Sequence, residues 1–270
     1  MTALQGEIAA RLDLARRAAC DAGKLTLSFF RSDNCAVETK SDGSPVTEAD
    51  RQTERELRRQ ISDSFPRDWV VGEEFGEQSG TSEFRWIVDP IDGTKSFVRG
   101  VPLYGTLVGV EHAGEPVAGV IYIPPLDECV YAALGSGAWY SRGGGKPERA
   151  AVSTRARLAE GLFLTSQVSS FAQRGAADAY RRLESAAGLT RTWGDCYGYL
   201  LVATGRAEAM VDPIMNLWDA AALAPIIEEA GGTFTDWSGK PTVASGEGVA
   251  TNRLVLDEVL AITRDYPAKP

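Results

Sequence analysis

The chain has 270 residues, of which 44% are hydrophobic and 24% are charged, a composition that excludes collagen-like, coiled-coil and largely disordered proteins. Its 37 acidic residues outnumber the 28 lysines and arginines, which gives a formal net charge of −9. We therefore expect no nucleic acid and no membrane surface among its partners, because both are bound through a basic footprint.

Two helices are predicted near the N-terminus. Apolar residues recur at three- and four-residue spacing from Leu4 to Ala19, which predicts an amphipathic helix. A loop rich in small polar residues follows over 31–46. A second helix is predicted from Thr47 to about Ser62, because Asp50 stands at the third helical position, as in a capping box.

From residue 69 onward the pattern changes to short strands. They are predicted at 69–71, 86–88, 107–110, 117–123, 130–134 and 138–140, with a hairpin turn at 113–115. The glycine run 143–145 and Pro147 mark a boundary between an N-terminal α+β half (1–146) and a C-terminal α/β half (147–270). The second half alternates strands (162–166, 209–211, 233–236) with helices (176–187, 197–203, 219–230), which is α/β patterning.

Histidine and cysteine limit the chemistry. The chain has one histidine, His112, which excludes histidine-based zinc clusters. We interpret it as a surface residue of the hairpin turn, which leaves no histidine for a His-dependent nucleophilic triad. Cys20, Cys35, Cys129 and Cys196 show no CxxC spacing, which indicates reduced thiols. The first 19 residues lack the apolar core of a signal peptide. We therefore expect a cytoplasmic protein.

Acidic residues gather after two predicted strands and at the start of a late helix. Glu73 and Glu74 follow one strand, Asp89 and Asp92 follow another, and Asp219 opens the helix. Each group alone is explained by a solvated surface or a turn. Together they predict a cation site, because neighbouring carboxylates repel one another and Mg²⁺ is held by carboxylates together with substrate phosphate.

Three motifs resemble those of the inositol monophosphatase superfamily. They are GEE at 72–74, WIVDPIDGT at 86–94 and WDAA at 218–221, in the family's order and spacing. The resemblance covers nearly the whole chain and implies a magnesium-dependent, lithium-sensitive phosphomonoesterase. It also implies an α/β (α+β) fold, the layered α/β/α/β/α sandwich of the inositol monophosphatase and fructose-1,6-bisphosphatase type, with metals between the two halves, and a homodimer.

The resemblance implies two or three Mg²⁺ ions in each active site. Glu73, Asp89 and the carbonyl group of Ile91 match the ligands of a first metal. Asp89, Asp92 and Asp219 match those of a second, and a third, weaker ion would use water on the Glu73 side.

The catalytic residues implied by the resemblance are Glu73, Thr94 and Asp50. Thr94 matches the residue that orients or deprotonates the attacking water, and Asp50 matches its acidic partner. A plain helix-capping role for Asp50 stays open. Lys40 lies near in sequence, and a solvated lysine explains it equally well.

The hydrolysis then follows from general chemistry. Metal coordination lowers the pKa of a water, and paired metals clamp the attacking and leaving oxygens. Asp92, Gly93 and Thr94 would contact the phosphate, whose charge the backbone N–H groups of 92–95 help to neutralise. No histidine and no covalent phosphoenzyme is needed.

Two further acids and one motif bear on the substrate. The run KSF (95–97) followed by GVPLY (100–104) resembles the histidinol-phosphatase branch of the superfamily. Asp195 stands where inositol-type members have a run of small residues and could pair with a substrate ammonium. The aromatic residues of the same stretch, Trp193, Tyr197 and Tyr199, could stack on an imidazole. Asp212 matches an acid that contacts the substrate. Alternatively, Asp195 caps a helix, Asp212 forms a turn and the aromatic residues fill core.

We therefore expect a histidinol-phosphate phosphatase of histidine biosynthesis, acting on a small phosphorylated metabolite. The alternatives are an inositol-1-phosphate phosphatase or a broad sugar-phosphate phosphatase of the same superfamily. A non-catalytic binding member of the fold is a remote alternative, since every predicted metal ligand is present.

Overall fold

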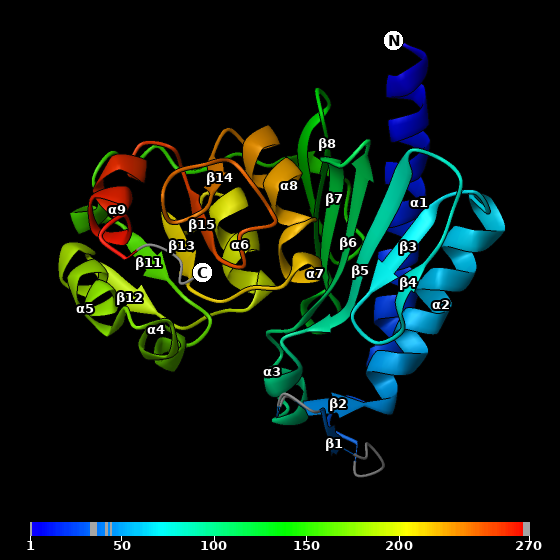
Figure 1. The fold of residues 1–270 in the computed structure, drawn as a ribbon, viewed down its shortest axis with the longest axis horizontal. Coiled ribbons are helices and arrows are strands. Elements are labelled where there is room, and N and C mark those ends of the chain that lie inside the picture. Colours follow the sequence, from blue (N-terminus) through cyan, green and yellow to red (C-terminus); the bar gives the residue numbers. More distant parts are fainter. Residues whose placement is uncertain (1, 33–36, 41–42, 44, 267–270) are drawn as a thin grey trace.

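The structure is a computed structural model that describes residues 2–32, 37–40, 43 and 45–266 (Figure 1). Cys35 and parts of the predicted 31–46 loop lie outside these residues. No helix in the described part of the chain is long and apolar enough to cross a membrane.

The larger sheet has eight strands. Its order is β10-β9-β8-β7-β6-β5-β3-β4, with β3 parallel to β5 and the other neighbours antiparallel. The strands are β3 (Trp69–Gly72), β4 (Gly76–Gln78), β5 (Phe84–Asp92), β6 (Gly105–His112), β7 (Glu115–Ile123), β8 (Glu128–Ala133), β9 (Gly137–Arg142) and β10 (Glu148–Arg149).

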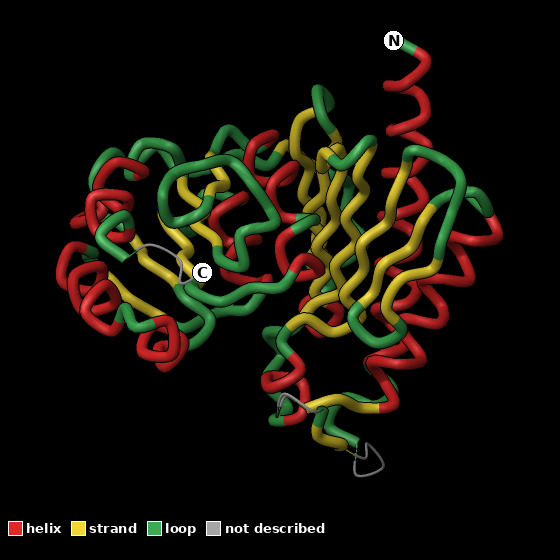
Figure 2. The backbone as a smooth tube through the Cα atoms, viewed as in Figure 1, coloured by secondary structure: helices red, strands yellow, loops and turns green. Residues whose placement is uncertain are grey.

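Two long helices, α1 (Ala3–Thr26) and α2 (Glu48–Ser64), cover one face of this sheet (Figures 1 and 2). Their apolar stripes pack on the strands, and Leu57 and Trp86 are fully buried between them. The predicted capping box of α2 is confirmed: the Thr47 amide donates to Asp50 Oδ2 at 2.7 Å.

The smaller sheet has five strands, in the order β12-β11-β13-β15-β14. They are β11 (Leu162–Leu164), β12 (Leu189–Arg191), β13 (Ala209–Asp212), β14 (Thr233–Thr235) and β15 (Gly248–Thr251). Helices α4 (Val168–Arg174), α5 (Ala177–Ala186) and α9 (Leu256–Thr263) pack on its outer face around buried Phe171 and Trp237.

A central layer of helices fills the space between the two sheets. It consists of α6 (Cys196–Ala203), α7 (Leu217–Ala220) and α8 (Leu223–Glu229), and one apolar core joins these helices to the facing sides of both sheets. The layers therefore run α/β/α/β/α (Figure 1), and the predicted fold class is confirmed. The division into 1–146 and 147–270 stays a prediction.

Smaller elements complete the chain. The hairpin β1 (Val37–Thr39) and β2 (Pro45–Thr47) lies beside α3 (Thr94–Val98) below the larger sheet (Figure 1). Two short 3₁₀ helices cover Pro124–Leu126 and Leu158–Glu160.

The structure corrects two predicted elements. The strand expected at 86–88 continues to Asp92, so Asp89 and Asp92 lie within β5, where the pairing with β6 shifts its register. The single helix expected over 219–230 is two helices, α7 and α8, divided at 221–222, because Pro225 has no N–H to donate to the Ala221 carbonyl. The backbone at 221–222 packs closely on Gly109 and Gly119 of the sheet. The elements α4, β15 and α9 were not predicted.

Candidate active site

Three carboxylates meet between the sheets. Asp89 and Asp92 come from the irregular end of β5, and Asp219 from the first turn of α7; one oxygen of each lies within 4.8 Å of the others. Asp219 is held there by its capping box, in which the Asn216 amide donates to Oδ2 at 2.6 Å. The fold therefore brings a residue of the second half against two residues of the first.

Burial and crowding make these carboxylates hold protons tightly. Burial raises the pKa of Asp89 well above its usual range, and the charges of Glu73, Asp92 and Asp219 add to the effect. Burial likewise raises the pKa of Asp92, and it raises the pKa of Asp219 to about 7. Ionising all three carboxylates is therefore energetically unfavourable unless a cation binds beside them.

Glu73 lies beside this cluster, in the turn after β3. It lines a small pocket of about 130 Å³ together with Asp89 and Asp219. Its Oε1 accepts from Lys40 Nζ at 2.6 Å, and the same ammonium donates to Glu74 at 2.7 Å. Lys40 therefore belongs to the edge of the site and is not a solvated lysine.

A buried carboxylate that was not predicted holds this turn. Glu54 of α2 is fully buried and accepts from the amides of Glu74 at 2.7 Å and Phe75 at 3.2 Å. Glu54 Oε1 also accepts a hydrogen bond from Arg58 Nε at 2.7 Å. A Cβ on Gly72 would lie 2.2 Å from Glu54 Oε1, which explains the glycine of the GEE motif.

Asp50 contacts Thr94 at the edge of the small pocket, which Thr94 lines. The two oxygens of Asp50 have different partners: Oδ2 caps α2 through Thr47, and Oδ1 is 3.4 Å from Thr94 Oγ1. The same hydroxyl is 3.1 Å from the carbonyl of Ile91. Burial raises the pKa of Asp50 to about 6, although the Thr47 hydrogen bonds lower it. Asp50 thus caps a helix and also contacts Thr94.

Asp92 and Gly93 join the first half to α6. The Cys196 amide donates to Asp92 Oδ2 at 2.5 Å, so Asp92 supplies the acceptor at the start of α6. Asp195 is the N-cap residue of α6, but its side chain accepts no hydrogen bond from the backbone of that helix. Gly93 adopts φ +88°, and a Cβ there would lie 2.9 Å from Asp195 Oδ2. The Asp195 carboxylate therefore lies directly over the Gly93 backbone.

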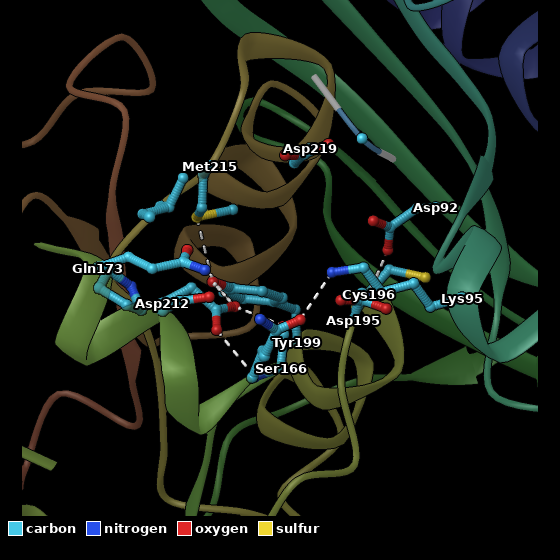
Figure 3. Close-up of a pocket in the computed structure, with 15 residues that line it drawn as sticks. Asp92, Lys95, Ser166, Gln173, Asp195, Cys196, Tyr199, Asp212, Met215 and Asp219 are labelled. Atoms are coloured by element: carbon cyan, nitrogen blue, oxygen red, sulfur yellow. Dashed lines mark hydrogen bonds between the residues drawn. The ribbon is translucent and has the colours of Figure 1, made fainter. Parts of the chain in front are cut away.

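A larger pocket of about 410 Å³ opens beside this point (Figure 3). Four residues line both pockets: Asp92, Lys95, Asp195 and Asp219. Lys95 is the only basic side chain among the lining residues of the two, and its Nζ donates to Gln167 Oε1 at 2.6 Å. Burial raises the pKa of Asp195 to about 6, and the neighbouring charge of Asp212 contributes.

Asp212 lies in the wall of the larger pocket with both oxygens occupied. Oδ1 accepts from Thr165 Oγ1 and the Ser166 amide, and Oδ2 accepts from Ser166 Oγ and Tyr199 Oη, at 2.8–3.1 Å. A carboxylate has about four lone-pair positions, so these bonds saturate it. Asp212 can act on a substrate through its charge, and its contact with the substrate stays a prediction.

The aromatic residues around Asp195 take different positions, and several other lining residues gave no sequence signal. Of the aromatic residues around Asp195, only Tyr199 lines the larger pocket, whereas Trp193 and Tyr197 line neither pocket. Tyr197 packs instead against the central core. The unpredicted lining residues are Gly43, Ser166, Gln167, Ser170, Gln173, Ile214 and Met215.

The donor set fits a hard divalent cation. The ligands offered by Asp89, Asp92, Asp219 and the adjacent Glu73 are all carboxylate oxygens, which Mg²⁺ prefers over nitrogen or sulfur ligands.

His112 lies in another pocket, where it packs on Phe84 and lies 3.4 Å from Glu83.

Comparison with known proteins identifies the family of this chain. The model of the inositol monophosphatase family matches residues 9–267. The histidinol-phosphatase of Chlorobaculum parvum is 44% identical over 253 residues, which cover 93% of this chain and 96% of that protein. The histidinol-phosphatase of Mycobacterium tuberculosis is 39% identical, with 92% and 96% covered.

A solved structure, the Thermotoga maritima IMPase, superposes with a TM-score of 0.84 at 34% identity and covers 95% of this chain and 98% of that one. Motifs, fold and relatives agree over nearly the full length, and the chain belongs to the inositol monophosphatase family.

Proposed function

We propose that this chain is a Mg²⁺-dependent histidinol-phosphate phosphatase of histidine biosynthesis. Membership of the family makes the chain a phosphoric monoester hydrolase that acts on small phosphorylated substrates. The relatives at 39–44% identity that carry the name histidinol-phosphatase support the choice of substrate.

Asp89, Asp92, Asp219 and Glu73, with the carbonyl of Ile91, would hold two or three Mg²⁺ ions. Their shared oxygen chemistry and raised pKa values support this assignment. When bound, Mg²⁺ supplies positive charge to the phosphate and lowers the pKa of the attacking water. Lithium sensitivity, a homodimer and a cytoplasmic location remain parts of the proposal.

Thr94 and Asp50 handle the proton of the attacking water. The Thr94 hydroxyl has one proton and two acceptors within reach, the Asp50 carboxylate and the Ile91 carbonyl. Its lone pairs therefore remain free to accept a hydrogen bond from water. As the water attacks phosphorus, its proton passes through this hydroxyl toward Asp50, whose pKa of about 6 suits a base near neutral pH.

The phosphate is placed by the segment that follows β5. The first helical bond of α3 runs from Ser96 N to Gly93 O, so the amides of 93–95 precede it and can donate to phosphate oxygens. Lys95 adds a positive charge at the junction of the two pockets.

The observation that carries the substrate assignment is the position of Asp195. Its carboxylate lies over Gly93, beside the phosphate-binding segment, and also lines the larger pocket. Histidinol phosphate carries an ammonium on the carbon next to the ester methylene. A carboxylate beside the phosphate-binding segment can pair with that ammonium, whereas a neutral polyol offers only hydroxyl groups there.

The test is phosphate release with Mg²⁺ from histidinol phosphate and from inositol-1-phosphate, compared as kcat/KM. We expect a preference for histidinol phosphate of at least about 100-fold, or about 2.7 kcal/mol. Asp195→Asn should remove most of this preference, because a neutral amide no longer pairs with the ammonium, while hydrolysis of inositol-1-phosphate changes much less.

Comparable or reversed values for the wild type would refute the assignment and favour the inositol or broad sugar-phosphate alternative. Absence of turnover across a panel of phosphate esters would favour a non-catalytic member of the fold.

A further inference from the structure

One end of the larger pocket carries an amide that the hydrolysis does not use. Gln173 lies on α4 and lines this pocket but not the smaller one. Its side chain points into the pocket toward Asp212 and Tyr199 (Figure 3). Within the described part of the chain, no side-chain hydrogen bond involves its amide. Both the donor and the acceptor of the amide are therefore available to a ligand.

The backbone that carries Gln173 is firmly held. Its neighbour Arg174 forms a buried ion pair with Glu247, donates to the Tyr266 carbonyl at 2.7 Å and lies 4.2 Å from the centre of the Trp237 ring. Trp237 in turn donates to the carbonyl of Asp212 at 3.2 Å. These contacts connect the backbone next to Gln173 to the backbone of Asp212 in the pocket wall. The exposed side chain of Gln173 therefore starts from a backbone position that is fixed relative to the pocket.

The same end of the pocket offers an apolar surface. Pro213, Ile214 and Met215 line it. Met215 is buried, and Ile214 keeps 52% of its surface exposed. Figure 3 shows Met215, Gln173 and Asp212 grouped together, away from Lys95 and Asp92. An apolar wall beside a free amide suits a flat ring that carries one N–H donor and one nitrogen acceptor at its edge.

We propose that Gln173 binds the imidazole ring of the substrate and is a specificity residue of this enzyme. The inference rests on the proposed function and extends it to the far end of the substrate. The order of groups in histidinol phosphate is phosphate, ammonium, ring. The site has its groups in a matching arrangement: Lys95, Asp92 and Asp195 line both pockets, whereas Gln173 lines only the larger one, and Gln173 lies away from Lys95 and Asp92 (Figure 3).

The amide of Gln173 accepts from the ring N–H or donates to the other ring nitrogen, while the side chains of 213–215 cover a face of the ring. The ring is remote from phosphorus, so this contact contributes binding energy to the transition state without taking part in bond making or breaking.

The experiment compares Gln173→Leu with the wild type on two substrates. One is histidinol phosphate, and the other is 2-aminopropyl phosphate, which keeps the ester and the ammonium but lacks the ring. Leucine preserves the approximate size of the side chain and removes its hydrogen bonds. Gln78→Leu is the matched control, because Gln78 is an exposed glutamine of β4 that lines neither pocket.

For histidinol phosphate, Gln173→Leu should lower kcat/KM by about 10-fold, or about 1.4 kcal/mol, and Gln78→Leu should not. For 2-aminopropyl phosphate, both variants should remain within about twofold of the wild type. The melting temperature of Gln173→Leu should match that of the control, since Gln173 is exposed.

Equal losses on both substrates, or no loss on histidinol phosphate, would overturn the role of Gln173 and leave the proposed function intact. A wild-type enzyme that does not prefer histidinol phosphate over inositol-1-phosphate would overturn the proposed function, and the ring subsite with it.

Discussion

Replacing Glu54 by Gln should loosen the turn that carries Glu73, and so lower both the stability of the fold and its affinity for Mg²⁺. Glu54 is fully buried, and its two oxygens accept three hydrogen bonds, from Arg58 Nε and from the amides of Glu74 and Phe75. The substitution changes neither the size of the side chain nor the helix around it. It removes one acceptor and one charge.

The size of the effect follows from these contacts. A glutamine oxygen at the Oε2 position leaves its NH₂ group facing Arg58 and the Phe75 amide; in the other orientation the NH₂ group faces the Glu74 amide. Each unsatisfied buried donor costs about 1–3 kcal/mol. In either orientation Arg58, whose side chain is only 12% exposed, loses the negative charge of its partner. We expect a loss of about 2–4 kcal/mol, or about 5–15 °C in melting temperature.

The assay is a thermal melt together with the Mg²⁺ dependence of phosphate release. Glu56→Gln is the control: Glu56 lies on the same helix and pairs with Arg59 at 2.6 Å, but Arg59 is exposed, so its loss should cost about 0–1 kcal/mol. Glu54→Gln should also need several-fold more Mg²⁺ for half-maximal rate. A melting temperature and Mg²⁺ dependence equal to those of Glu56→Gln would refute the reasoning.

Two further predictions concern the other acids. The rate of the wild type should fall as the pH drops through about 6, the pKa of Asp50. Asp50→Asn should lower kcat/KM by about 100-fold and abolish that fall; a variant that keeps it would contradict the role of Asp50. Burial raises the pKa of Asp50 and Asp195 to about 6 and of Asp219 to about 7. Without Mg²⁺, the folded chain therefore binds more protons than the unfolded chain between about pH 5 and 7. Its free energy of unfolding should fall as the pH rises through that window. Added Mg²⁺ should therefore raise the melting temperature more at pH 8 than at pH 5.5, and equal shifts would contradict this account.

The sequence predicts those parts of the site that depend on local pattern. The capping box at Thr47 and the acids at 73, 89, 92 and 219 stand in recognisable positions, so the fold class and the cluster of carboxylates could be expected. Local pattern also indicates most strands of the larger sheet, because its hairpins join neighbours in the chain.

Other features depend on contacts between distant residues. Glu54 is one of several charged residues in a polar helix, and only its contact with a turn 20 residues away makes it special. The saturation of Asp212 by Ser166 and Tyr199 is equally invisible in the sequence. The short helix α4 has no side-chain cap, so neither its position nor that of Gln173 could be predicted.

The hydrogen bond from Cys196 N to Asp92 Oδ2 spans 104 positions of the chain, and it bears on how the protein is made. During synthesis, Asp89 and Asp92 emerge well before α6 and before Asp219. A nascent chain that ends between them therefore carries crowded acids with neither their helix partner nor their third carboxylate. On the proposed function, Mg²⁺ would therefore stabilise the chain only after Asp219 has been made and the two sheets have closed on the central helices, which is a late stage of folding.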